Sequence, residues 1–155
     1  SIINTWRWNM AYKDKAKKKI SDNKYFSTLT GFLKALYSAA MRRCRNNVKK
    51  NRKEIPFNLA RDDFFAVFWK QVETLGGIYC AYTGTPMTHK RGTGRVGTNI
   101  SLDRIDNTKG YTKDNITFCT ADFNDLKGSV TIDACQRILD VYKERIGYVE
   151  EDDKL

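Results

Sequence analysis

Residues 99–127 have the sequence NISLDRIDNTKGYTKDNITFCTADFNDLK, and this stretch decides the fold of the chain. Apolar and polar residues alternate from 100 to 105, which predicts a strand. Residues 107–110 contain Asn and Gly, which tolerate the left-handed backbone of a tight turn. The β-branched and aromatic residues at 116–120 predict a second strand. A helix can begin at 121 and continue to 127, so we expect a β-hairpin followed by a short helix.

Two side chains of this stretch can present oxygen atoms to one cation. Asp103 falls on the first predicted strand, and Asn124 falls on the predicted helix. Carboxylate and amide oxygens are the ligands that hard divalent ions prefer.

Several short motifs occur in and before this stretch. They are C-x-x-T-G at 80–84, S-L-D-R-I-D at 101–106, G-Y at 110–111, N-I at 115–116 and N-x-x-K at 124–127. With these motifs the chain resembles the HNH (His-Me finger) endonucleases, most closely a branch common in phage and mobile elements. The likeness covers about residues 33–130. It implies an α+β fold, with a helical body around a ββα-metal hairpin-helix core. The alternative is an ordinary hairpin with Asx turns.

The resemblance implies a metal-dependent DNA endonuclease that hydrolyses phosphodiester bonds, nicking or cutting duplex DNA. It implies that Asp103 and Asn124 hold one divalent cation, Mg²⁺ or Mn²⁺. It also implies that Asn115 braces the hairpin loop by hydrogen bonds and that Lys127 faces a phosphate. Such a cation polarises the phosphate and stabilises the leaving oxygen, while a general base deprotonates the attacking water.

The identity of the base stays open. In most HNH enzymes the residue after the metal-binding Asp is a His, but here it is Arg104, which stays protonated and can only clamp a phosphate. A nonspecific-nuclease relative with the motif D-R-G-H would place Asp106 at the base position. Alternatively His89, the only His in the chain, moves in from its loop. In the third account the site is catalytically impaired, and the protein only binds DNA.

Length and composition fit one domain, or one small domain with an appendage. The chain has 155 residues, 41% of them hydrophobic, and no apolar run long enough for a membrane span.

Its four cysteines never form C-x-x-C, and Thr83 stands where zinc-bearing relatives have a second Cys, so a structural zinc is not expected. We expect the cysteines to be reduced core residues, with Cys80 and Cys119 close together. We therefore expect an intracellular protein that is not secreted.

Positive charge is concentrated in the first third of the chain. Residues 1–54 hold fifteen Lys and Arg against three Asp and Glu, while the rest of the chain is slightly acidic. This asymmetry predicts binding to a polyanion. Apolar residues at helical spacing predict a helix over 30–48 with one buried stripe. We expect its other faces to bind DNA phosphates through five cations: Arg42, Arg43, Arg45, Lys49 and Lys50. RNA is an alternative partner, because a basic, aromatic-bearing arm suits it equally well.

We divide the chain into four segments. They are a basic, aromatic-bearing arm (1–29), a helical DNA-binding part (30–77), the HNH-like core (78–130), and a C-terminal helix with an acidic tail (131–155). A second, largely buried helix is predicted over 61–75, with glycines as its stop. Residues 88–98 are predicted to be a mobile basic loop. The last helix, capped by Thr131, is expected to pack on the core.

Overall fold

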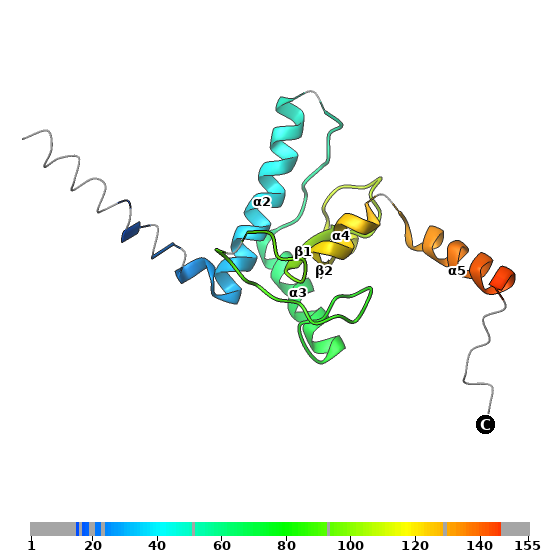
Figure 1. The fold of residues 1–155 in the computed structure, drawn as a ribbon. Helices are drawn as coiled ribbons and strands as arrows, with labels where there is room; N and C mark the ends of the chain where they lie inside the picture. Colours follow the sequence, from blue (N-terminus) through cyan, green and yellow to red (C-terminus); the bar gives the residue numbers. More distant parts are fainter. Residues whose placement is uncertain are drawn as a thin grey trace, which may run out of the picture.

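The computed structural model describes residues 15, 17–18, 21–22, 24–50, 52–92, 94–128 and 130–146. Most of the expected basic arm and all of the acidic tail lie outside the described residues. The described elements, in chain order, are α2 (Leu29–Lys49), α3 (Arg61–Leu75), β1 (Ile100–Arg104), the 3₁₀ turn η1 (Lys113–Asn115), β2 (Ile116–Thr120), α4 (Ala121–Lys127) and α5 (Ile132–Ile146) (Figure 1). The fold is therefore α+β, as predicted. None of the described helices is long and apolar enough to cross a bilayer.

The predicted hairpin is confirmed. Strands β1 and β2 pair antiparallel, with Asp103 opposite Thr117 and Leu102 opposite Phe118. Because side chains alternate between the two faces of a strand, Leu102 and Asp103 point in opposite directions. Leu102 and Phe118 are buried in the core.

Helix α3 packs on β2, and both of its predicted ends are confirmed. Phe64 and Phe68 lie edge-on to Phe118, with ring centroids 5.1 and 5.0 Å away. The helix ends at Gly76, whose φ of +71° is the left-handed geometry that favours glycine at a helix end. These aromatic contacts make α3 the main support of the hairpin.

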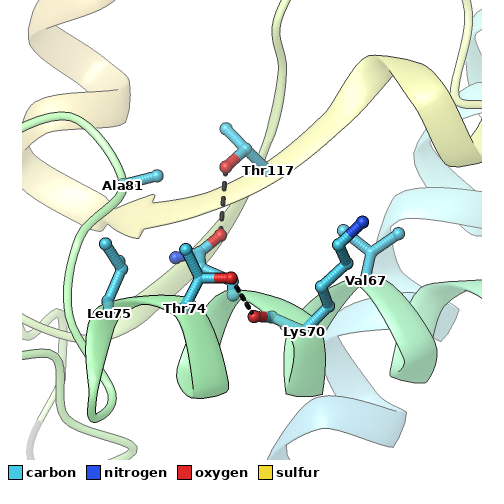
Figure 2. Close-up of a pocket in the computed structure, with 7 residues that line it drawn as sticks. Val67, Lys70, Thr74, Leu75, Ala81 and Thr117 are labelled. Atoms are coloured by element: carbon cyan, nitrogen blue, oxygen red, sulfur yellow. Dashed lines mark hydrogen bonds between the residues drawn. The ribbon is translucent and has the colours of Figure 1, made fainter.

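Gln71 ties α3 to the backbone of β2. Its Oε1 accepts hydrogen bonds from the Phe118 amide and the Thr117 hydroxyl, each 3.0 Å long. Its Nε2 donates to the carbonyl oxygens of Phe118 and Tyr79, each at 2.9 Å. Thr117 points from β2 toward α3, across a hollow of about 300 Å³ between them (Figure 2). A single side chain thus satisfies backbone groups that the two-stranded sheet leaves unpaired.

Helix α2 begins where Thr28 accepts a hydrogen bond from the Gly31 amide. Its buried stripe contains Leu33, Tyr37, Ala40 and Cys44, as the apolar spacing predicted. The Tyr37 hydroxyl donates to the Leu59 carbonyl at 2.8 Å, which fixes the link between α2 and α3. The predicted buried stripe does not continue to the C-terminal end of the helix, because Val48 is exposed there.

Helix α5 forms as predicted, but its expected packing on the core is wrong. Thr131 accepts a hydrogen bond from the Ala134 amide and caps the helix. Nevertheless Ile138 is 66% exposed, Leu139 and Val141 are also exposed, and the helix projects away from α2, α3 and the hairpin (Figure 1). The core face of the hairpin is instead covered by α2, which contacts β1, and by α3, which contacts β2. Cys135 on α5 is exposed, which also corrects its assignment to the core.

Candidate functional site

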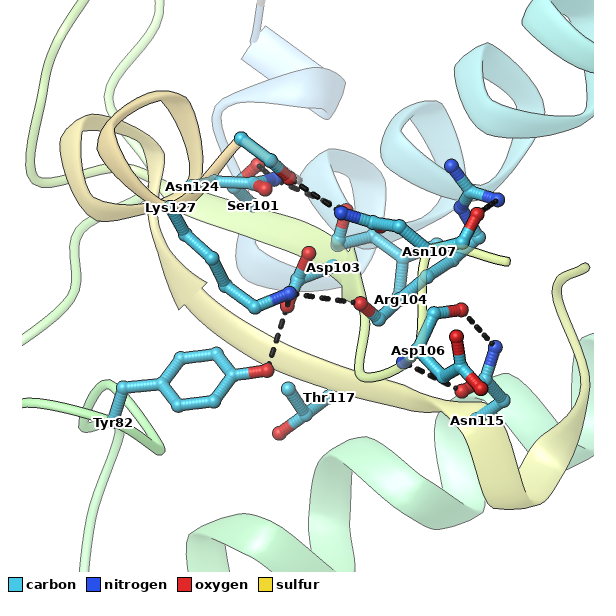
Figure 3. A network of polar contacts seen from close by, with 12 residues as sticks. Tyr82, Ser101, Asp103, Arg104, Asp106, Asn107, Asn115, Thr117, Asn124 and Lys127 are labelled. Carbon is cyan, nitrogen blue, oxygen red and sulfur yellow. Dashed lines mark hydrogen bonds and ion pairs between the residues drawn. The ribbon is translucent and has the colours of Figure 1, made fainter. Parts of the chain in front are cut away.

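Asp103 is the centre of a buried polar network at the junction of β1 and α4. Asp103 as a whole is 3% exposed to solvent. Its Oδ2 accepts a hydrogen bond of 2.7 Å from the Tyr82 hydroxyl and lies 2.9 Å from the Lys127 ammonium. Figure 3 shows Tyr82 and Lys127 approaching this carboxylate from different elements. The carboxylate is therefore neutralised within the protein and not by solvent.

Lys127 is buried, contrary to the expectation that it faces a phosphate. It is the last residue of α4, a helix that Thr120 caps and that packs on β1. Its Nζ donates to the carbonyl oxygen of Arg104 at 3.0 Å, in addition to pairing with Asp103. Burying a charge is costly unless it is paired and hydrogen-bonded. Both partners of the Lys127 ammonium, the Asp103 carboxylate and the Arg104 carbonyl, belong to β1.

Tyr82 is a site residue that the sequence did not single out. Burial, together with the hydrogen bond to the Asp103 carboxylate, raises the pKa of Tyr82 far above its usual value. Its ring stacks on Phe123 of α4, with centroids 5.0 Å apart. Tyr82 lies inside the C-x-x-T-G motif, but nothing in that motif signals a partner 21 residues further along the chain.

Asn124 has one end of its amide fixed and the other end without a hydrogen bond. Its Nδ2 donates to Ser101 Oγ at 2.7 Å and to the Leu102 carbonyl at 3.3 Å. These contacts hold the side chain against β1 next to Asp103. The amide oxygen is left as the group that can accept a ligand.

The donors present fit a hard divalent cation in kind, although they are few. Among the described residues, Asp103 Oδ1 and Asn124 Oδ1 have no hydrogen bond, and both are oxygens of the type that Mg²⁺ and Mn²⁺ prefer. No group of three or more His, Cys, Asp or Glu side chains in that part of the chain is arranged to hold a metal. Mg²⁺ is often bound by one or two protein ligands together with water and substrate phosphates.

The structure separates Arg104 from the Asp103 carboxylate. Arg104 and Asp103 are adjacent on β1, so their side chains lie on opposite faces of the hairpin. The Arg104 guanidinium donates to the carbonyl oxygens of Asn107 and Lys109, at 3.0 and 2.7 Å, and lies 5.5 Å from the centre of the Tyr111 ring. Arg104 therefore holds the hairpin turn.

Asp106 is also engaged in the turn. Its Oδ1 accepts hydrogen bonds from the amide and hydroxyl of Thr108, at 2.9 and 2.6 Å, and Lys109 lies 3.3 Å from its Oδ2. The bonds from Thr108 lower the pKa of Asp106. A carboxylate with a lowered pKa is a weaker base, so this environment works against Asp106 as the group that deprotonates water.

His89 lies outside the Asp103 network. Its ring packs edge-on to Phe32, with centroids 6.3 Å apart, and it borders a hollow of about 520 Å³ with Lys90 and Arg91. The first residues of the loop at 88–98 are hydrogen-bonded to Asn99, directly after the loop. Asn99 accepts a hydrogen bond from the Lys90 amide and donates one to the Lys90 carbonyl, each 2.8 Å long. His89 is thus fixed against α2.

Asn115 braces the hairpin loop, as the resemblance implied. Its Oδ1 accepts from the Asp106 amide at 2.9 Å, and its Nδ2 donates to the carbonyls of Asp106 and Gly110 at 3.1 and 2.8 Å. The side chain is buried, so these bonds are protected from water.

Two of the cysteines lie under this network. Cys80 and Cys119 are both buried, and negative charge on either sulfur would raise the pKa of Tyr82 further, so both are neighbours of the same site. Burial and the Asp103 charge raise the pKa of Cys119 to about 12. Burial opposes ionisation of Cys80 too, but hydrogen bonds from Thr83 and from backbone amides hold its pKa below the usual value.

Cations gather in two neighbouring hollows, one along the C-terminal half of α2 and one between the end of α2 and the hairpin turn. The first, of about 320 Å³, is lined by Ala39, Arg42, Arg43, Asn46, Asn47, Lys50 and Arg52. The second, of about 160 Å³, shares Asn47 and Arg52 with the first and extends to Arg104 and Lys109. Glu54 is the one acidic residue that lines either hollow. We call these two hollows the cationic groove.

The groove includes some of the predicted DNA-binding residues and not others. Arg42, Arg43 and Lys50 line it, whereas Arg45 and Lys49 do not. Burial raises the pKa of Cys44, and the guanidinium groups of Arg104 and Arg43 act against that rise. Asn47 and Arg104 line the same hollow, which places the end of α2 and the hairpin turn side by side along the groove.

Comparison with known proteins adds no relative to this description: the chain matches no family model, no curated protein and no solved structure.

Proposed function

We propose that the protein is a metal-dependent endonuclease of the HNH type that hydrolyses phosphodiester bonds in DNA. The observation that carries the proposal is the buried Asp103 carboxylate beside Asn124, at the junction of a β-hairpin and a helix. A carboxylate is seldom buried without a functional or structural need. In a ββα-metal core these two residues would hold one Mg²⁺ or Mn²⁺, which supplies charge that stabilises the leaving oxygen.

Cations on α2 and at the hairpin turn support a nucleic-acid substrate. The cationic groove contains Arg42, Arg43, Lys50 and Arg52 and is nearly free of acidic side chains. Lys and Arg side chains in such a groove bind the phosphate backbone largely without regard to sequence. Arg104 and Asn115 fix the turn that borders the groove, so they position substrate through the backbone of the hairpin.

A supercoiled-plasmid assay with Mg²⁺, Mn²⁺ or EDTA tests this function. We expect metal-dependent nicking that Asp103→Asn abolishes. Asparagine is the better substitution than alanine, because it keeps the size of the side chain and an oxygen that can accept hydrogen bonds from Tyr82 and Lys127. The matched control is Asp114→Asn, an equal change of charge at an exposed position of η1. Equal nicking by the wild type and Asp103→Asn would refute the assignment.

A second candidate is a DNA-binding module without catalysis. The observation that favours it is the placement of the two base candidates: Asp106 holds the turn, and His89 packs on Phe32. Arg104, at the usual base position, stays protonated and also holds the turn. Under this candidate the protein shifts DNA on a gel but leaves it intact with either metal. Competition between duplex DNA and structured RNA distinguishes both functions from RNA binding, and a preference for RNA of about tenfold or more would favour the latter.

A further inference from the structure

Lys127 occupies one oxygen of the carboxylate that the proposed metal ion needs. Its Nζ is 2.9 Å from Asp103 Oδ2, and the two side chains are 2% and 4% exposed. The ammonium is also hydrogen-bonded to the Arg104 carbonyl at 3.0 Å and lies 5.7 Å from the centre of the Tyr82 ring. The two opposite charges of the pair neutralise each other without any ion from solution.

A divalent cation and this ammonium compete for Asp103. Like charges at close range repel, and the repulsion grows as water is excluded. The burial of the pair therefore makes it unfavourable to add a second cation while Lys127 stays in place. In the free protein the affinity of Asp103 for a metal must include the cost of displacing Lys127.

An ammonium that leaves Asp103 needs another anion. The other two carboxylates of α4, Asp122 and Asp125, are already paired with Arg95 at 2.7 and 2.5 Å. A lysine side chain is flexible and binds phosphate as a point charge. A phosphodiester bound beside Asp103 would offer the charge that Lys127 loses.

We propose that Lys127 is an internal counterion that keeps divalent cations off Asp103 in the free protein and passes to a substrate phosphate when DNA binds. The inference rests on the proposed function, since it assumes the metal site at Asp103. It makes metal and DNA binding cooperative, and linkage requires the coupling to be equal in both directions. It also accounts for a lysine that is buried in the free state at a position where the family resemblance implies a phosphate contact.

The first test is a Mn²⁺ titration of the folded protein without DNA, in which calorimetry measures the binding. We expect Lys127→Met to bind Mn²⁺ about tenfold more tightly than the wild type, within the usual range of coupling between sites. The matched control is Lys113→Met, because Lys113 forms an exposed ion pair with Asp63 at 3.5 Å. That variant should bind Mn²⁺ like the wild type. Lys127→Gln, which retains a hydrogen-bond donor for Asp103, provides a second variant if the methionine does not fold.

The second test uses fluorescence anisotropy to measure DNA binding with and without Mn²⁺. The wild type should gain more DNA affinity from Mn²⁺ than either Lys127 variant. A Lys127 variant that folds but binds Mn²⁺ no more tightly than the wild type would overturn the inference.

The two proposals fail in different ways. Nicking that depends on Asp103, without any gain in Mn²⁺ affinity in the Lys127 variants, removes the counterion role and leaves the nuclease. Tighter Mn²⁺ binding that Asp103→Asn cancels, without nicking under any condition, retains the counterion role and removes the nuclease.

Discussion

Asp103 shows how one residue can depend on three partners from different parts of the chain. Its carboxylate accepts a hydrogen bond from the Tyr82 hydroxyl and forms an ion pair with the Lys127 ammonium. It also lies beside the Asn124 amide. A buried charge of this kind is stable only while its partners stay in place. Substitutions of Tyr82 and Lys127 therefore report on the site itself.

Tyr82 gives this network a measurable pH dependence. Its pKa is raised in the folded protein by burial and by Asp103, so the unfolded chain releases the tyrosine proton first as pH rises. The contribution to stability is present below about pH 10, the pKa of an unperturbed tyrosine, and is lost as pH rises above it. We expect Tyr82→Phe to flatten the fall in the free energy of unfolding above pH 10, measured by urea denaturation.

The control for that measurement is Tyr79→Phe, which removes a hydroxyl from an exposed tyrosine three residues away. It should leave the alkaline slope as in the wild type. An unchanged slope in Tyr82→Phe would mean that the hydroxyl of Tyr82 is not held by Asp103 in solution.

At the scale of elements, the sequence predicted local structure well. The bounds of α3, both strands and α4 follow from apolar periodicity, turn residues and glycine stops, all of which act over a few residues. The bracing role of Asn115 was also predictable, because its partners lie within the same hairpin.

Contacts between distant segments were not predictable in the same way. Tyr82, Gln71 and the burial of Lys127 depend on packing between segments that are 21 to 47 residues apart. The orientation of Arg104 was not predictable for a related reason: a motif gives the order of residues, whereas the pleat of the strand decides which face each side chain takes.

Helix α5 is the element whose environment the sequence predicted least well. The apolar side chains are at helical spacing, yet Ile138 and Leu139 are exposed, because the hairpin face is covered by α2 and α3. We expect Cys135 to react rapidly with a thiol reagent such as DTNB, while Cys44, Cys80 and Cys119 react slowly because they are buried.

Cys135→Ser should remove the fast phase of that reaction and leave the slow phases unchanged. If all four thiols react slowly in the folded wild type, α5 is covered in solution, and sedimentation would then show whether a second copy of the chain covers it.

For the molecule as a whole, the cationic groove connects the helical body to the hairpin. It lies between α2 and the turn that Arg104 holds, and it is lined by cations from both. If DNA follows this groove, its affinity should fall steeply as salt rises, because each phosphate contact releases bound counterions. Cations on α2 that lie outside the groove should contribute much less to that dependence.

Two double variants with equal changes of charge separate these cases. Arg42→Gln with Lys50→Gln removes two cations from the groove, whereas Arg45→Gln with Lys49→Gln removes an arginine and a lysine that do not line it. We expect the first pair to reduce the slope of log K against log salt by about 1.8, since each phosphate contact contributes about 0.9, and the second pair to change it little. Equal changes in both variants would mean that DNA contacts α2 over its whole charged surface. A change in the second pair alone would place the DNA on a face of α2 outside the groove, and the groove would then have no part in binding.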